Sequence, residues 1–363
     1  MQKLFVRPVP PELLQQLPWW SPYASLIALI LLWSLAALLL GAVGAGIAAW
    51  PLRGARDKPW HERARLAYSL RVTLLMQMLV WPMVALTISS VWPLPFGFTS
   101  LAWRCFPPAV AALLVLAWMR YAGERRILKK RYSIWQLLRN TVVYHFALGH
   151  VTLVVALVAL IAMPWKLSGN VVIIVAVTVA VIGFLCCGGS LRILRGLGLL
   201  TPADGRLNRI VAAAARDVGA PLPVSYVAHM PSANALAFPW NGKLAFSTGI
   251  LQSLDDEQLE SIAAHEICHL GMPASQKFLR LAHALALQIT LTLRKPIWGE
   301  FGTAAILPSL LGFLAVVVGL QFWGRRLMRR EEERADRAGA AVNESVYALA
   351  LEKIYRENLM PAN

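Results

Sequence analysis

The sequence predicts a mainly α-helical membrane protein that also carries a small soluble domain with a short β-sheet or hairpin. Of its 363 residues, 58% are hydrophobic and only 15% are charged, and the mean hydropathy is +0.56. Soluble domains do not have such a composition, and the apolar residues gather in runs long enough to span a bilayer. Residues 191–277 differ, because their mixed composition is that of a soluble domain.

Five long apolar runs come before this soluble segment and define a five-span membrane domain at residues 1–190. The runs are residues 24–49, 72–92, 104–119, 141–163 and 169–188. Trp19 and Trp20 precede the first run, as aromatic residues do at a membrane interface. A cleaved signal peptide is the alternative interpretation of the first run, but the run is longer than the apolar part of such peptides.

The charges of the connecting loops predict how the chain is oriented. The net charge is +16, and lysines and arginines gather in residues 51–65 and 120–139, whereas the loops on the opposite side hold only Arg104 and Lys166. Basic loops stay in the cytoplasm, so the N-terminus is expected outside a plasma (inner) membrane and the soluble segment inside. The same clustering beside apolar runs argues against nucleic-acid binding.

Local patterns within the soluble segment predict a helix at residues 204–218 and a short strand at residues 223–228. Residues 234–238 and 243–247 then flank an Asn-Gly pair, Asn241-Gly242, which suits a two-residue hairpin turn. An exposed edge strand of this kind can hold an extended peptide by strand pairing.

A short motif, His265-Glu266-Ile267-Cys268-His269, follows the predicted hairpin. Asp255 lies where a helix would begin and Gly271 where it would end, so we expect the motif to be helical. Four residues make about one turn, which places both imidazoles on one face, close enough to share a metal ion. Glu266 lies about 100° round the helix, where a carboxylate can take a proton from a metal-activated water.

A later acidic run offers a third metal ligand. Among Glu331, Glu332 and Glu333, only Glu332 has an aspartate, Asp336, four residues further along the same helical face. Asp336 can accept the second ring N–H of a ligand histidine and so fix its tautomer. The alternative interpretation is a solvated helix face that forms salt bridges to the neighbouring arginines. A thiolate ligand from Cys268 is a further, less favoured possibility.

Taken together, these residues resemble the integral-membrane gluzincin metallopeptidases, the family of the HtpX heat-shock protease and the CAAX prenyl endopeptidases. The resemblance covers residues 205–357 and is carried by the His265–His269 motif, by residues 247–251 and by residues 332–336. It implies a zincin-like metallopeptidase domain with a small sheet, and one zinc ion held by His265, His269 and Glu332. Five spans before this domain, and Cys268 in place of the family's usual glycine, are departures from the pattern.

The domain organisation that follows from this interpretation divides the metallopeptidase domain into two parts. The first part is residues 191–277 and the second is residues 325–363, with a membrane helical hairpin at residues 278–324 between them. Because the two parts must share one site, the intervening chain crosses the membrane twice or not at all.

The predicted function is that of a zinc metalloendopeptidase that cleaves membrane or membrane-proximal polypeptides at the cytoplasmic face, in protein quality control. Glu266 is the expected general base, and Asn234 and Ala235 the expected substrate-binding residues, although Asn234 is also suited to capping a turn. A sensor protease and a non-enzymatic scaffold with a structural metal are the alternatives. Glu266 argues against the scaffold, because a structural zinc needs no general base.

Overall fold

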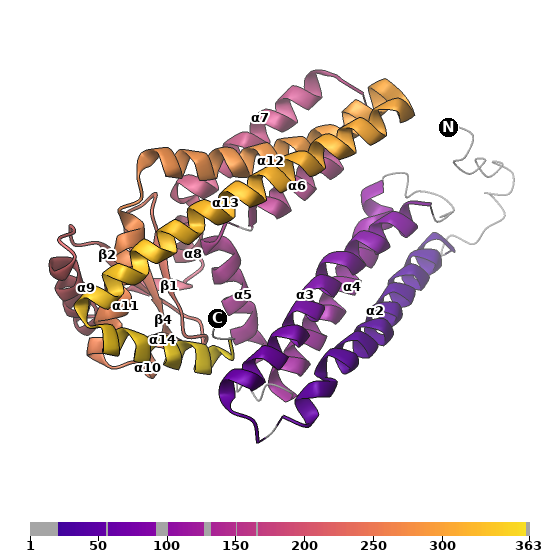
Figure 1. Cartoon of the computed structure of the whole chain (residues 1–363). Helices are drawn as coiled ribbons and strands as arrows, with labels where there is room; N and C mark the ends of the chain where they lie inside the picture. The colour runs from indigo at the N-terminus through magenta and orange to yellow at the C-terminus, as the bar shows by residue number, and fades with distance from the viewer. Residues whose placement is uncertain are drawn as a thin grey trace, which may run out of the picture. The chain divides into compact units, whose positions relative to one another are not determined.

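The computed structural model describes residues 21–55, 57–91, 101–126, 132–149, 151–164 and 166–360 (Figure 1). The fold is mainly helical with one small sheet, which confirms the predicted fold class. The chain divides into two compact units, Met1–Ile134 with Leu359–Asn363, and Trp135–Asn358. Trp19 and Trp20, the predicted interfacial aromatic residues, lie outside the described residues.

The first unit contains three long helices, α2 (Ser21–Arg53), α3 (Trp60–Val91) and α4 (Leu101–Arg126). They contact one another through a core in which small residues allow close approach of the backbones. The buried residues of this core are Trp33, Ala37, Ala85, Ala109, Ala112 and Leu116. Within the described residues, four helical segments are long and apolar enough to cross a membrane, namely Tyr23–Arg53, Trp60–Ser89, Arg104–Arg126 and Gly169–Gly196.

The predicted fourth apolar run, residues 141–163, is not one continuous helix. It is divided between α5 (Ile134–Ala147) and α6 (Val151–Ala162). Gly149 lies between them with a φ of 73°, a conformation that ends a helix and that hydropathy does not reveal. The two helices have 14 and 12 residues, fewer than the roughly 20 that span a bilayer. How often this run and residues 278–324 cross a membrane stays a prediction, as does the domain boundary at residue 190.

The last of the four membrane-length segments is kinked and leads directly to the sheet. It consists of α7 (Gly169–Phe184), a π-helical turn η2 (Leu185–Gly189) and α8 (Ser190–Gly196). Gly188 has a φ of 111° and packs against the side chain of Asn241, so that a Cβ here would lie 2.1 Å from Asn241 Nδ2. Glycine at the kink therefore lets the hairpin loop seat directly against the helix backbone.

The sheet has the order β1-β2-β4-β3, with β1 (Leu200–Pro202), β2 (Val224–Ala228), β3 (Ala235–Phe238) and β4 (Lys243–Ser247). β2 and β4 are parallel, whereas the other two pairs are antiparallel. β3 and β4 form the predicted hairpin, and β3 is an edge strand. The last pair is Phe238 with Lys243, so the connection has four residues and not the predicted two. Pro239 follows Phe238 and has no N–H with which to extend the pairing.

Helices cover both faces of the sheet because its residues alternate between two apolar clusters. Leu244 and Phe246 pack with α9 (Gly205–Asp217) and α11 (Asp256–Leu270), whereas Ala245, between them, packs with residues of α5 and α8. A short helix, α10 (Thr248–Ser253), leads from β4 to α11, and α14 (Glu344–Asn358) packs onto the α11 side.

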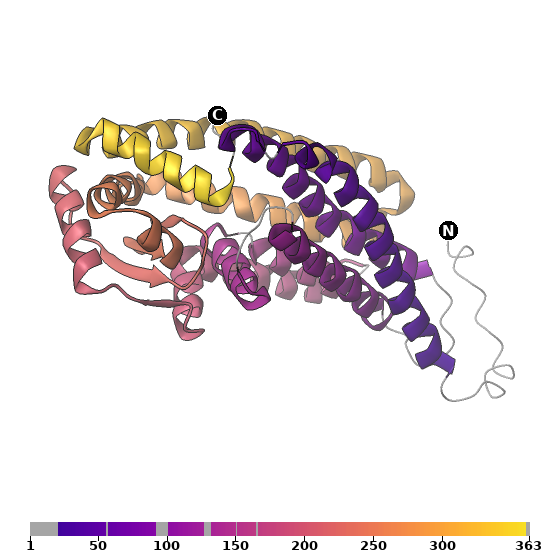
Figure 2. The ribbon, with the colours of Figure 1, turned by 90° about the horizontal axis from the view of Figure 1, so that it is seen from below.

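Two long helices complete the second unit. α12 (Ala274–Phe301) and α13 (Ile306–Val342) are joined by a short 3₁₀ turn, η3 (Gly302–Ala305), and lie side by side (Figure 2). α13 continues without a break past residue 324, the predicted end of the membrane hairpin. One helix thus carries both the apolar segment and the acidic run.

Candidate functional site

The helix that carries the histidine motif begins as its sequence predicts. Asp255 caps α11, because its carboxylate accepts a hydrogen bond from the Gln258 amide at 2.9 Å. The Gln258 side chain in turn accepts from the Asp255 amide at 3.4 Å, which completes a capping box. Ala263, Ala264 and Ile267 bury the inner face of the helix in the core. The motif therefore lies on a helix fixed at its start and along one face.

Arg334 of α13 holds the other end of α11. Its Nη2 donates to the Cys268 carbonyl oxygen at 2.7 Å, which also accepts from the Gly271 amide at 3.2 Å where the helix ends. Its Nε approaches Cys268 Sγ at 3.2 Å. The thiol therefore faces Arg334 and is not part of the cluster that the two histidines form.

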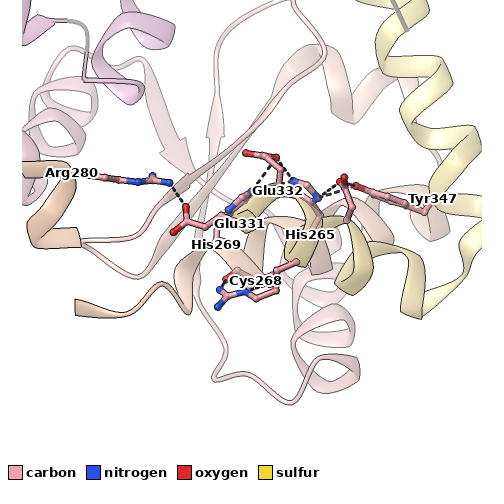
Figure 3. Close-up of polar contacts among 9 residues, drawn as sticks. His265, Cys268, His269, Arg280, Glu331, Glu332 and Tyr347 are labelled. Carbon is pink, nitrogen blue, oxygen red and sulfur yellow. Dashed lines mark hydrogen bonds and ion pairs between the residues drawn. The ribbon is translucent and has the colours of Figure 1, made fainter. Parts of the chain in front are cut away.

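His265, His269 and Glu332 converge from two helices (Figure 3). The Nε2 atoms of the histidines lie 3.2 Å apart. Glu332 Oε2 lies 3.7 Å from His265 Nε2 and 3.8 Å from His269 Nε2. One nitrogen from each ring and one carboxylate oxygen thus surround a common point.

The neighbouring acids of the run point elsewhere. Glu331 accepts a hydrogen bond from Arg280 of α12, and Glu333 pairs with Arg329 at 3.1 Å along the surface of α13. Consecutive residues lie about 100° apart around a helix, so only one of the three can face α11. In this structure it is Glu332, as the position of Asp336 predicts.

The cluster fits a zinc ion in spacing and in chemistry. Ligands about 2.0–2.1 Å from a tetrahedral zinc lie about 3.3 Å from one another, close to the separations found here. Both histidines have lowered pKa values, that of His269 falling to about 4, chiefly because burial disfavours the charged ring. A neutral imidazole keeps the lone pair that binds metal.

The outer side of His265 contacts two further groups. Its Nδ1 lies 3.2 Å from Asp336 Oδ1, which is the contact predicted from the spacing of the acidic run. It also lies 2.8 Å from the hydroxyl oxygen of Tyr347, on α14. Sequence reasoning missed Tyr347, because nothing in the local pattern of α14 distinguishes it from an ordinary core residue.

Glu266 lies beside the cluster, and its carboxyl group is a weaker acid than an ordinary glutamate. Burial, and to a smaller extent the negative charge of Glu332, raise its pKa to about 8 although a hydrogen bond from the Ala237 backbone amide acts in the opposite direction. The carboxyl group can therefore exchange a proton near neutral pH. The contact with Ala237 also places Glu266 at the edge of the sheet.

Strand β3 turns towards this site the backbone groups that it does not use for pairing with β4. The Ser247 amide donates to the Asn234 carbonyl oxygen at 2.9 Å, and the Asn234 amide donates to Ser247 Oγ at 2.9 Å. In the alternating pattern of an antiparallel pair, the N–H and C=O groups of Ala235 and Ala237 then point away from β4. Because the Ala237 amide reaches Glu266, that outer edge faces the cluster. Asn234 uses its backbone to anchor the hairpin, and substrate contact by its side chain stays a prediction.

Membrane-length helices joined to a small sheet with a histidine and glutamate cluster define a membrane-associated protein of the metallopeptidase class. A family model for peptidase family M48 matches residues 202–358. "Protease HtpX homolog 1" of Streptomyces coelicolor is 31% identical over 224 residues, which cover 58% of this chain and 72% of the relative. The chain belongs to peptidase family M48 and is of the HtpX type, which confirms the resemblance seen in the sequence.

Other relatives agree over a shorter length. A "Protease HtpX homolog" of Caldanaerobacter subterraneus is 28% identical over 214 residues, 52% of this chain and 71% of the relative. That of Persephonella marina is 29% identical over 160 residues, 41% of this chain and 56% of the relative. The chain spans about half the length of several relatives, such as the 49% of the Tropheryma whipplei (strain TW08/27) homologue. No solved structure matches the chain.

Proposed function

We propose that this protein is a membrane-embedded zinc metalloendopeptidase that hydrolyses peptide bonds of membrane or membrane-proximal proteins at the cytoplasmic face. The observation that carries the proposal is the convergence of His265, His269 and Glu332 with Glu266 directly beside them. Three protein ligands leave one coordination position for water or substrate, which is the arrangement of catalytic rather than structural zinc sites.

His265 Nε2, His269 Nε2 and a Glu332 carboxylate oxygen would hold the ion. Bound zinc supplies Lewis acidity, which polarises a substrate carbonyl and makes an attacking water more acidic. The donor set supports zinc, because two imidazoles and one carboxylate recur in catalytic zinc hydrolases. Asp336 contributes its negative charge 3.2 Å from His265 Nδ1, which favours a proton on that nitrogen and leaves Nε2 unprotonated.

Glu266 is the general base in this proposal. Its carboxylate accepts the proton of the attacking water and passes it to the leaving amine. Part of its raised pKa comes from the negative charge of Glu332. A cation held by the cluster offsets that charge and returns Glu266 towards the carboxylate form, so that it is ready to accept a proton.

Strand β3 would position the substrate. An extended polypeptide can pair with the outward N–H and C=O groups of Ala235 and Ala237, which brings its backbone next to Glu266. Binding through main-chain hydrogen bonds gives affinity without a strict sequence requirement. Such a site suits a protease that removes varied proteins, and the resemblance to the HtpX heat-shock protease supports a role in quality control.

The membrane setting and the orientation complete the proposal. The long apolar helices favour a location in a lipid bilayer. The basic loops favour a site on the cytoplasmic side of a plasma (inner) membrane. A sensor protease in a signalling pathway and a non-enzymatic scaffold with a structural metal are the alternatives. The scaffold alternative does not explain why a carboxylate lies beside the cluster, because a structural zinc needs no general base.

The test compares purified full-length protein with its Glu266→Gln variant in detergent. The wild type should contain about one zinc and cleave an unfolded protein such as casein. Glu266→Gln should keep its zinc and lose cleavage by about 10²- to 10⁴-fold, the typical contribution of general acid–base catalysis. A wild-type protein that contains zinc but cleaves no substrate would favour the alternative of a non-enzymatic scaffold. A comparison of membrane proteomes from cells with each form then identifies the substrates.

A further inference from the structure

The phenol of Tyr347 lies between His265 and Asp336. Its hydroxyl oxygen is 2.8 Å from His265 Nδ1 and 2.7 Å from Asp336 Oδ1. The direct distance from His265 Nδ1 to Asp336 Oδ1 is longer, at 3.2 Å. The tyrosine therefore makes the shorter contact with the histidine, on the side of the ring that faces away from Glu332.

Counting donors assigns the direction of these hydrogen bonds. An ionised aspartate only accepts, so the single hydroxyl proton of Tyr347 goes to Asp336. The hydroxyl oxygen is then left to accept a proton, which His265 Nδ1–H supplies. With its proton on Nδ1, His265 presents an unprotonated Nε2 to His269 and Glu332. The hydroxyl thus selects the tautomer that can bind a metal.

Tyr347 is the rigid member of this trio. Its side chain is buried, with 5% of its surface exposed, whereas the Asp336 side chain is 55% exposed. An exposed carboxylate exchanges rotamers and water contacts readily, and a buried aromatic ring does not. The ring also lies nearly parallel to that of His265, at 26° and a centroid distance of 6.1 Å. The orientation of the His265 ring is therefore held by Tyr347 more than by Asp336.

Other parts of the chain are adapted to hold the ring in this place. Gly339 of α13 leaves room for it, because a Cβ at that position would lie 2.6 Å from Tyr347 Cε2. Asn343 starts α14 by accepting the Val346 amide on its side chain, and its carbonyl oxygen accepts the Tyr347 amide at 2.9 Å. Further along α14, Lys353 Nζ donates to Gln258 at the start of α11. α14 is thus fixed to both helices that form the cluster.

We propose that Tyr347 is a positioning residue that holds His265 in the tautomer and ring orientation required for metal binding. The inference rests on the proposed function, because it takes the cluster to be a zinc site. The site then depends on a third helix, α14, in addition to the helices that carry the histidine motif and the acidic run. Residues that orient a ligand histidine typically change metal affinity by about 10- to 100-fold when they are replaced.

The test measures zinc affinity of the full-length protein by competition with a chromophoric chelator. Tyr347→Phe keeps the ring and removes only the hydroxyl, so zinc should bind about 10-fold more weakly. The visible spectrum of the Co²⁺-substituted variant should shift, because the ligand field at His265 changes. Tyr226→Phe is the matched control, since Tyr226 is similarly buried, at 4%, in the other apolar cluster. It should bind zinc like the wild type.

A second substitution probes the placement of the ring. Gly339→Ala should also weaken zinc binding, because the added methyl group displaces Tyr347. Gly312→Ala is its control, a position in the same helix with no atom within 4 Å of the added carbon. Combined with Tyr347→Phe, Gly339→Ala should add little further loss, since both act on one contact.

The outcomes separate this inference from the proposed function. If the wild type binds zinc tightly and Tyr347→Phe matches it in affinity and cobalt spectrum, Tyr347 has no positioning role and the zinc site still stands. If Tyr347→Phe destabilises the metal-free protein by as much free energy as it costs zinc binding, the role of the hydroxyl is purely structural and the inference fails. A wild type that binds no zinc overturns both.

Discussion

Arg280 of α12 donates to Glu331 of α13, the residue that directly precedes Glu332. The rotation of α13 that brings Glu331 to Arg280 also turns Glu332 towards His265 and His269. Glu333 points to the opposite side, where it pairs with Arg329. The three consecutive glutamates therefore face three different partners, and Glu332 is the one that faces the histidines.

This arrangement predicts different results for three alanine substitutions. Glu332→Ala should lose zinc, because it removes the only carboxylate of the cluster. Glu333→Ala should retain about one zinc, and so should Glu331→Ala, since the partner Arg280 is half exposed and can be solvated. Elemental analysis of the purified proteins measures this. Full zinc occupancy in Glu332→Ala would assign the ligand to another residue.

The acidity of Glu266 predicts how the stability of the metal-free protein depends on pH. In the folded protein its pKa is about 8, above the ordinary value of 4.5. Between these values the folded state keeps a proton that the unfolded state has lost, so this group lowers stability as pH rises from about 4.5 to 8. Glu266→Gln removes the contribution.

Thermal unfolding of both proteins in chelator, across this pH range, measures the effect. The melting temperature of Glu266→Gln should exceed that of the wild type more at pH 8 than at pH 5. The histidines act oppositely, since the lowered pKa of His269 makes stability rise with pH from about 4 to 6.5, but they are common to both proteins. An unchanged difference between the two proteins would contradict the buried, protonated state of Glu266.

The outward edge of β3 predicts the effect of proline on cleavage. Ala235→Pro removes an N–H that points away from β4, so the hairpin should stay paired while a substrate strand loses a hydrogen bond. Cleavage of casein should fall by about 5-fold with zinc content unchanged, since one hydrogen bond contributes about 1 kcal/mol. Asn234→Ala should have a smaller effect, because the contacts of Asn234 with Ser247 use its backbone. Normal cleavage by a folded, zinc-bound Ala235→Pro would exclude pairing along this strand.

The basic loops predict the sidedness of the membrane. In a cysteine-free background, single cysteines at Gln15 and Gly97, both outside the described residues, should react with an impermeant thiol reagent added to intact cells. Cysteines at Lys58 and Arg209, both exposed, should react only after the membrane is opened. Ser247 is unsuitable for this test, because only 1% of it is exposed. The reverse labelling pattern would place the site outside the cytoplasm.

The sequence could predict those features that depend on neighbours along the chain. The capping box of Asp255 and Gln258, the shared face of His265 and His269, and the spacing of Glu332 and Asp336 all follow from helical geometry. The break near Gly149 was not predicted, because a hydropathy window averages over a single change in backbone conformation. Tyr347 was not predicted either, because its contact with His265 joins residues 82 positions apart. Such a contact exists only once α11, α13 and α14 have packed together.

The continuity of α13 has a mechanical consequence. Glu332 belongs to the same unbroken helix as the apolar segment that starts at Ile306. An α-helix resists twisting and bending over such a length, so it acts as a stiff rod that rises about 1.5 Å per residue. If the predicted membrane hairpin at residues 278–324 lies in a bilayer, a change in bilayer thickness that tilts the apolar end of this helix would also move the Glu332 carboxylate near its other end. The geometry of the His265, His269 and Glu332 cluster would then depend on the thickness of the surrounding bilayer.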